Sequence, residues 1–206
     1  MRTLSAPRMM SENDSPAHRI LNAAEEVLRR HGVQKTNVVD IARTLGMSHG
    51  NIYRHFPSKQ ALLDAVAVRW LHQVTGPLEA IASNPARPAP ERLAAWFDTL
   101  RKAKRRKVLD DPELFQVYHQ IVENMREVVN EHVATLLGQV ERIIVEGVAA
   151  GIFARGLDAR LAARAFLHAT SRFHHPALIL QEPAPTEEDA RVVLGLLLSG
   201  LRNGAV

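Results

Sequence analysis

Residues 37–59 read NVVDIARTLGMSHGNIYRHFPSK, and this stretch decides how the first part of the chain folds. Asn37 can cap a short helix. The apolar side chains of that helix recur at helical spacing: Val38, Ile41, Ala42 and Leu45. Gly46 suits the left-handed conformation that ends a helix, Ser48 can begin a second helix, and Pro57 stops it. Two short helices joined in this way predict a helix-turn-helix, whose second helix enters the major groove of DNA.

The second short helix would present polar groups to the outside if Ile52 points inward. The outward set is rich in hydrogen-bonding groups: Ser48, His49, Gly50, Asn51 and Arg54. Asparagine can pair with adenine and arginine with guanine, so these residue types can read base edges. Three flanking side chains suit phosphate contacts: Tyr53, His55 and Lys59. The same pattern also fits the polar surface of a small helical bundle that binds no DNA.

The stretch from Arg19 to Leu71 resembles the DNA-binding domain of the tetracycline-repressor (TetR) family of bacterial transcriptional regulators. Three segments carry the likeness: VVDIA at 38–42, GMS at 46–48 and GNIYRHFPSK at 50–59. The resemblance implies a three-helix DNA-binding head, a fourth linking helix, and an all-helical body that binds a ligand and forms a dimer. It therefore favours the DNA-binding interpretation over the plain bundle.

Residue by residue, the resemblance assigns three kinds of DNA contact. It places Asn37 and Val38 at the DNA backbone. It gives the base edges to His49, Gly50 and Asn51, and the phosphates to Tyr53, His55 and Lys59. Two positions depart from the family pattern. Val39 stands where some members have a basic base-reading residue, and Asn51 replaces a smaller side chain, so Asn51 is expected to set the operator preference.

Across the whole chain, the spacing of glycine, proline and apolar residues predicts an all-α fold of about nine helices. We expect a flexible tail over 1–14, a helix-turn-helix domain with its linking helix over 15–75, and a ligand-binding and dimerisation domain over 76–206. The expected helices include 16–31, a fourth helix ending at Gly76-Pro77, 91–107, 158–175 and 187–203. A break within 111–151 is expected, but the pattern does not place it.

The composition limits the classes of protein that fit. Residues 1–75 hold 10 Lys and Arg against 6 Asp and Glu, whereas 76–206 hold 16 of each, so the net charge of +4 lies in the first third. A local basic excess suits phosphate binding. The absence of cysteine excludes thiolate catalysis and disulfides and favours the cytoplasm. No apolar run predicts a membrane span or signal peptide, and no motif predicts an enzyme, a cofactor or a metal site.

The second domain is expected to hold a pocket for a hydrophobic or amphipathic small molecule that acts as inducer. The candidate lining residues are Trp96, Leu100, Phe115, Tyr118, His119, Met125, Phe153, Phe166, Phe173 and His174. Most are apolar and also fit an ordinary core, whereas Tyr118, His119 and His174 would need a polar partner if buried. His174 and His175 are adjacent on the chain, so their side chains diverge and are not expected to share a metal.

The last two predicted helices, 158–175 and 187–203, favour a homodimer. Residues 192–201 are apolar on almost every face, and a helix of this kind must be covered by other protein. A two-fold dimer would also let two heads read a palindrome in double-stranded operator DNA. The basic run at 101–107 fits favourable helix-end charges, a second contact with DNA, or a contact with a partner protein. An alternative to ligand control is therefore control by a protein partner.

Overall fold

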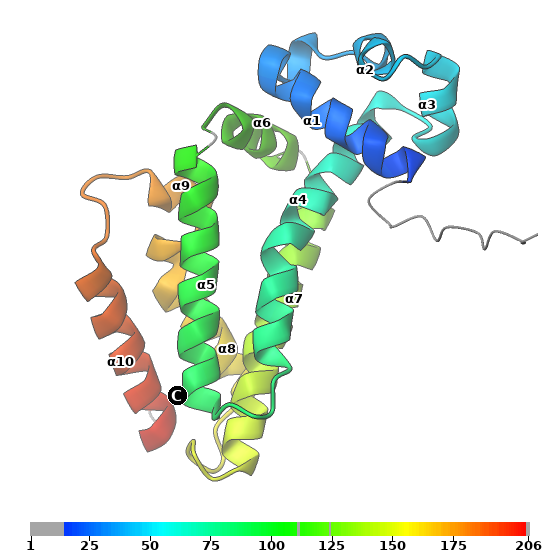
Figure 1. The fold of residues 1–206 in the computed structure, drawn as a ribbon. Coiled ribbons are helices and arrows are strands. Elements are labelled where there is room, and N and C mark those ends of the chain that lie inside the picture. The colour runs from blue at the N-terminus through cyan, green and yellow to red at the C-terminus, as the bar shows by residue number, and fades with distance from the viewer. Residues whose placement is uncertain (1–14, 111, 124, 205–206) are drawn as a thin grey trace, which may run out of the picture. The chain divides into compact units, whose positions relative to one another are not determined.

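The computed structural model describes residues 15–110, 112–123 and 125–204 (Figure 1). These residues form ten α-helices and one 3-10 turn, with no strand among them, so the all-α prediction is confirmed. Helices α1–α8 and α10 correspond to the nine that the sequence predicts. The additional helix, α9 (Pro176–Ile179), is a single turn. The tail predicted over residues 1–14 lies outside the described residues.

The chain divides into two compact units. The first comprises residues 1–68 and 116–124, and the second comprises 69–115 and 125–206. Helix α4 (Lys59–Ala82) contributes residues to both units, and so does α6 (Pro112–Glu123). The sequence pattern gave no sign that part of α6 belongs with the N-terminal helices.

Helix α1 (Pro16–Lys35) begins at Ser15, whose Oγ accepts a hydrogen bond from the His18 amide at 3.2 Å. The predicted end at residue 31 falls at a kink and not at the end of the helix. Gly32 takes a φ of 71°, which interrupts the helix, but helical structure resumes as far as Lys35. The Gly32 carbonyl then accepts from both the amide and the hydroxyl of Thr36, at 3.2 Å and 2.7 Å, which ends the helix.

Helices α2 (Val38–Leu45) and α3 (His49–His55) form the predicted helix-turn-helix. Gly46 joins them in the left-handed conformation, with a φ of 63°, which glycine adopts without a steric penalty. Helix α2 packs against both α1 and α3. The core of this unit is built from fully buried aliphatic side chains, which are Ile20, Ala24, Leu28, Ile41, Ile52, Leu62 and Val66.

Helix α4 does not end at Gly76-Pro77, as predicted, but continues to Ala82. A proline inside a helix removes one backbone hydrogen bond and normally breaks the helix. Here Leu78 and Ala82 are fully buried in the core of the second unit. Burial of these apolar side chains offsets the loss at the proline, so tertiary packing overrides the local signal.

The second unit is built on α5 (Ala89–Asp110), α7 (Arg126–Ala149), α8 (Ala159–Thr170) and α10 (Glu187–Asn203). Helix α7 packs against α5 and α8, and α8 packs against α10. Helix α10 starts at Thr186, which forms a capping box with Asp189. The break that the sequence could not place falls between Glu123, where α6 ends, and Arg126, where α7 begins.

Helix α8 is shorter than the predicted range of 158–175. It ends at Thr170 and is followed by a 3-10 turn, η2 (Ser171–Phe173). The buried Thr170 hydroxyl bonds back to the Phe166 carbonyl at 2.8 Å, an interaction that competes with regular helix geometry. His174 then adopts a non-helical φ of −142°, so the turn carries its side chain off the α8 axis.

Gly147 marks the closest packing in the second unit. A Cβ atom at this position would overlap the ring of Phe153 and would lie 2.9 Å from the Ala89 Cβ. Phe153 itself is 2% exposed and belongs to the hydrophobic core. The absence of a side chain at Gly147 therefore makes room for the Phe153 ring against α7.

Candidate nucleic-acid interface and ligand-binding region

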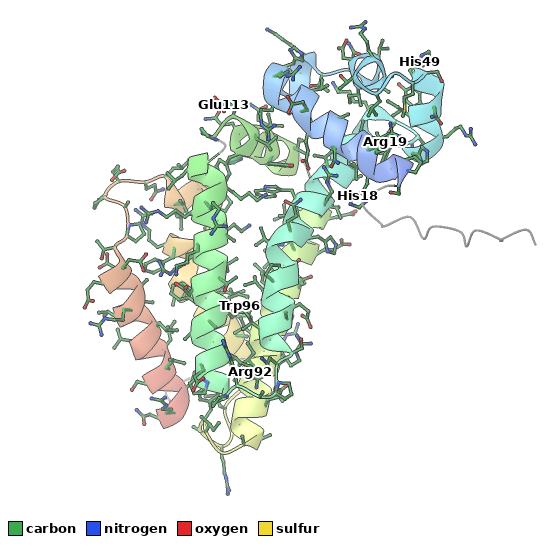
Figure 2. All side chains as sticks on the ribbon, viewed as in Figure 1. His18, Arg19, His49, Arg92, Trp96 and Glu113 are labelled. Carbon is green, nitrogen blue, oxygen red and sulfur yellow. The ribbon has the colours of Figure 1, made fainter. Side chains whose placement is uncertain are left out.

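The outward face of α3 is polar and accessible, and its position is fixed by Ile52, which is fully buried. His49 lies at the start of this helix (Figure 2). Seven residues on or next to α3 are predicted to contact DNA, and all of them are exposed except Asn51, which is half-buried: Ser48, His49, Gly50, Asn51, Tyr53, Arg54 and His55. The helix thus presents hydrogen-bonding groups on one side and anchors itself through a single isoleucine on the other.

Contacts within α3 orient two of its candidate base-reading residues. The rings of His49 and Tyr53 meet edge to face, with centroids 6.3 Å apart. The Asn51 Nδ2 group lies 3.8 Å from the sulfur of Met47, a weak acceptor. The oxygen of the Asn51 carboxamide makes none of the hydrogen bonds found among the described residues. Met47 therefore positions this amide, and the amide oxygen can still accept a hydrogen bond.

At the start of α2, backbone groups are better placed than side chains to contact a phosphate. Asn37 caps the helix, because its Oδ1 accepts a hydrogen bond from the Asp40 amide at 2.9 Å. Val38 is 5% exposed, so its side chain belongs to the core and only its backbone can face a phosphate. Val39 is 50% exposed and gives α2 an accessible apolar group beside α3.

Lys59 has a structural role that the sequence did not predict. Its Nζ donates to the Val33 carbonyl at 3.1 Å and so connects the start of α4 to the end of α1. Ser58 caps α4, since its Oγ accepts from the Ala61 amide at 3.0 Å. The ammonium group of Lys59 has three donors, so one bond to Val33 leaves others for a phosphate.

The ten predicted pocket residues do not all fall in one unit. Tyr118 and His119 lie on the part of α6 that belongs to the first unit, and the other eight belong to the second. The Tyr118 hydroxyl donates to the Glu25 carboxylate of α1 at 3.0 Å, and Tyr118 is 2% exposed. In the first unit, Tyr118 therefore connects α6 to α1.

Most of the remaining predicted pocket residues are packed together as core. Five belong to the main hydrophobic cluster of the second unit: Trp96, Leu100, Phe153, Phe166 and Phe173. Trp96, labelled on α5 in Figure 2, meets Phe166 edge to face at 6.3 Å and donates from Nε1 to Gln139 Oε1 at 2.9 Å. Phe115 and Met125 are also buried, whereas His174 is half-buried. The sequence missed Phe97, whose ring lies 5.4 Å from that of Phe173.

A cavity of about 470 Å³ lies beside α5, η2 and α9 in the second unit. Phe173 is the predicted pocket residue that lines it. The lining combines apolar side chains, among them Val108, Leu109, Phe173, Ile179 and Leu180, with four cations, Arg101, Lys102, Arg105 and Arg172, and two carboxylates, Glu182 and Glu187. This volume and mixed lining are typical of sites for small amphipathic molecules.

Several cations around the cavity already have partners. Arg101 pairs with Asp98 and with Glu187, each at 2.5 Å. Lys102 also pairs with Asp98, at 2.7 Å. Arg172 donates to backbone carbonyls of the segment that follows α9, including that of Pro183 at 2.8 Å. Much of the charge at the rim therefore holds the second unit together.

A buried basic cluster lies in the second unit and was missed at the sequence level, apart from His174. Lys104 on α5 is 5% exposed, and its Nζ lies 3.4 Å from His132 Nε2 and 5.2 Å from the centre of the Trp70 ring. His174 Nε2 lies 3.2 Å from Thr170 Oγ1. The available signal was the register of α5, where Lys104 follows core residues at helical spacing.

Burial sets the charge of this cluster. It lowers the pKa of Lys104 to about 8, helped by repulsion from Lys107. Burial and the charge of Lys104 lower the pKa of His132 to about 3 and that of His174 to about 4. At neutral pH the cluster thus contains one ammonium ion beside two uncharged imidazoles.

The described residues also bear on metal binding and membrane insertion. In that part of the chain, no three or more His, Cys, Asp or Glu side chains are grouped as metal ligands. None of the described helices is both long enough and apolar enough to cross a membrane.

A polar recognition helix held on a three-helix core defines a helix-turn-helix DNA-binding protein. Comparison with protein families agrees. The family described as "Bacterial regulatory proteins, tetR family" matches residues 20–66, and "Tetracyclin repressor-like, C-terminal domain" matches residues 89–193. The second match alone covers half of the chain. The chain belongs to the TetR family and is a DNA-binding transcriptional regulator.

The chain is similar to regulators over nearly its full length. It is 26% identical over 188 residues to the fatty acid metabolism regulator protein of Bacillus subtilis, covering 89% of this chain and 94% of that protein. It is 25% identical over 203 residues to the HTH-type transcriptional repressor KstR2 of Mycolicibacterium smegmatis, covering 95% of each.

Among solved structures, FadR of Bacillus subtilis in complex with stearoyl-CoA has 25% identity and a TM-score of 0.63, covering 88% of this chain and 97% of FadR. SmeT, the repressor of a Stenotrophomonas maltophilia multidrug efflux pump, has a TM-score of 0.66 at 22% identity, covering 92% of each chain. The likeness to SmeT shows a shared fold.

Proposed function

We propose that this regulator is a homodimeric repressor that binds a palindromic operator and is released from it by a small amphipathic ligand. The observation that carries the proposal is the exposed polar face of α3, which is anchored by the buried Ile52. In this proposal His49, Gly50 and Asn51 meet base edges, with Ser48 and Arg54 beside them. Tyr53, His55 and Lys59 contact phosphates, together with the backbone at Asn37 and Val38.

The dimer is proposed to form through α8 and α10. Exposed positions on α10 recur at helical spacing and are apolar or small: Val192, Gly195, Leu196 and Ser199. Leu196 is 69% exposed, and Leu161 on α8 is 47% exposed. Large aliphatic side chains in a row gain free energy when a second copy covers them. A two-fold pair of heads about 34–36 Å apart then matches successive major grooves.

Ligand control is supported by the cavity and by similar proteins. FadR of Bacillus subtilis has been crystallised with stearoyl-CoA, and SmeT with triclosan, and both ligands carry large apolar parts. Helix α4 passes through both units of this chain, so a ligand that displaces its second half can alter the position of its first half. The ligand must bind the DNA-free arrangement more tightly, by about 1–3 kcal/mol for typical coupling.

The proposal is tested by selecting DNA that the full-length protein binds from a randomised pool. We expect an inverted repeat with half-sites one helical turn apart. Leu196→Glu should yield a folded monomer that loses affinity for the repeat, and Arg191→Glu, an exposed charge on the same helix, is the matched control. Recovery of a single half-site, or full affinity of the Leu196→Glu monomer, would contradict the dimeric mode.

Release by a ligand is tested separately on the selected operator. A library of amphipathic compounds should contain members that lower operator affinity and raise the melting temperature of the free protein. If no compound does either, while a bacterial protein fraction releases the operator, control by a protein partner replaces ligand control.

A further inference from the structure

We propose that Lys104, His132 and His174 form an internal binding site for the carboxylate group of an acidic, amphipathic ligand. The inference rests on the proposed ligand control and names the chemistry of the ligand. It is carried by a buried cation that lacks a counter-ion. Lys104 is 5% exposed, yet no carboxylate among the described residues forms an ion pair with it.

The contacts that Lys104 does make leave its charge uncompensated. The ring of Trp70, 5.2 Å from Nζ, supplies a cation–π attraction, and His132 Nε2 at 3.4 Å accepts at most one of its three protons. A buried charge without a partner is strongly unfavourable. Among the described residues one other cation is buried, and it is paired: Arg92, labelled in Figure 2, is 4% exposed and lies 2.6 Å from Glu146.

A second buried donor lies on the same histidine. When His132 Nε2 accepts from Lys104, its proton is on Nδ1, and His132 Nδ1 is buried without a hydrogen-bond partner. His174, held by Thr170, closes another side of the cluster with a neutral ring. Lys104 Nζ keeps protons for a carboxylate, whose single negative charge would compensate the lysine. His132 Nδ1 lies on the side of the ring away from Lys104, so it offers a separate buried donor to another polar group of the ligand.

The surroundings define the remainder of the ligand. Arg101 and Val108, one helical turn before and after Lys104 on α5, line the cavity of about 470 Å³, and His174 directly follows the cavity-lining Phe173. Lys104, His132 and His174 do not line the cavity themselves, but it comes within one helical turn of Lys104 along α5. An acid with an apolar body can place its carboxylate at Lys104 and its body against the aliphatic and aromatic side chains.

The experiment uses the full-length protein without DNA and two pairs of probes. Decanoate and 2-naphthoate are the acids, and decanamide and 2-naphthamide are their neutral analogues. The variant is Lys104→Met, which keeps the length of the side chain and removes its charge. The control is Arg106→Gln, which removes an exposed charge from the same helix at a position that does not line the cavity.

We expect at least one acid to raise the melting temperature of the wild type and of Arg106→Gln by several degrees, with a smaller effect of its amide. In Lys104→Met the acid should have no larger effect than the amide. Without any probe, Lys104→Met should melt higher than the wild type, because it no longer buries an unpaired charge.

A spectroscopic measurement reports on the site directly. The chain has two tryptophans, so Trp96→Phe leaves Trp70 as the only indole, 5.2 Å from Lys104 Nζ. Binding of the acid should change the Trp70 emission in this variant, and adding Lys104→Met should abolish the change.

Three results would overturn the site: no preference of the wild type for an acid over its amide, an undiminished acid response in Lys104→Met, or loss of that response in Arg106→Gln instead. If an acid binds through Lys104 but does not release the operator, the site stands and the proposed control by this ligand fails.

Discussion

The α3 surface and the Lys104 cluster use polar side chains in opposite ways. On α3 the polar groups are exposed, and one buried isoleucine supplies the stability. In the second unit a lysine and two histidines lie within or against the apolar core, where burial disfavours their charged forms. Substitutions on the first surface should therefore change binding more than stability, whereas changes in the second region should alter stability even without a ligand.

The largest expected effect is at the anchor of the α3 surface. Ile52→Ala removes a fully buried side chain and should lower the free energy of unfolding of the first unit by about 2–5 kcal/mol. Arg54→Ala, on the exposed side of the same helix, should change it by less than about 0.5 kcal/mol. Urea unfolding of both variants measures this contrast, and equal losses would refute the one-anchor description.

Acid should destabilise the second region through its histidines. The folded state lowers the pKa of His132 to about 3 and of His174 to about 4, so the unfolded chain binds protons first as pH falls below about 6.5. Each histidine should then reduce stability by about 1 kcal/mol per pH unit, down to its folded pKa.

The measurement is the free energy of unfolding between pH 7 and pH 5. Carboxylates elsewhere also titrate with pH, so the informative quantity is the difference between the wild type and the variants His132→Gln and His174→Gln. A slope that neither substitution reduces would show that these histidines are not the source.

Close packing in the second unit should be sensitive to a single methyl group. Gly147→Ala places a Cβ on the Phe153 ring and should cost about 1–3 kcal/mol. Gly138→Ala on the same helix meets open space and should stabilise by about 0.5–1 kcal/mol, because alanine favours a helix over glycine. Thermal denaturation of the pair separates the two cases, and a stabilising Gly147→Ala would contradict the packing described here.

Asn51 should affect specificity more than stability. Asn51→Ala is expected to reduce discrimination at one or two base pairs of each half-site by about 1–3 kcal/mol. The contact with Met47 is weak, so the stability of the head should change little. Binding preferences over randomised DNA give the answer, and unchanged preferences would exclude Asn51 as a base reader.

The smallest effect is expected at Tyr53. Tyr53→Phe removes a hydroxyl proposed to contact a phosphate, so affinity for operator and random DNA should fall equally, by about 1 kcal/mol or less. Titrations of both DNAs at one salt concentration measure this change. A loss restricted to the operator would instead assign Tyr53 to a base.

The sequence was sufficient to predict the structure of those regions where local signals and tertiary packing agree. Gly46, Ser48 and the apolar spacing around Ile41 and Ile52 define the helix-turn-helix through backbone conformation and amphipathic pattern. It failed at Pro77, because burial of distant side chains sustains α4 beyond a helix-breaking residue.

The candidate ligand region was harder to predict, because it depends on contacts between distant parts of the chain. Aromatic residues were natural pocket candidates, yet Trp96 and Phe166 pack against each other as core. Lys104 looked like one cation within a solvent-exposed run, and only its contacts with Trp70 and His132 distinguish it. Side-chain chemistry alone does not show which of several neighbouring lysines is buried.

The division of α6 between the two units has a consequence for biosynthesis. Residues 116–124 belong to the same compact unit as the N-terminal helices, and Tyr118 bonds to Glu25 across 93 positions of sequence. The DNA-binding unit is thus discontinuous, and it is completed only after the ribosome has made α5 and most of α6. Native contacts that join distant segments form late during folding. A nascent chain that ends before residue 116 therefore carries an incomplete head, with the α1 surface that receives Tyr118 still uncovered.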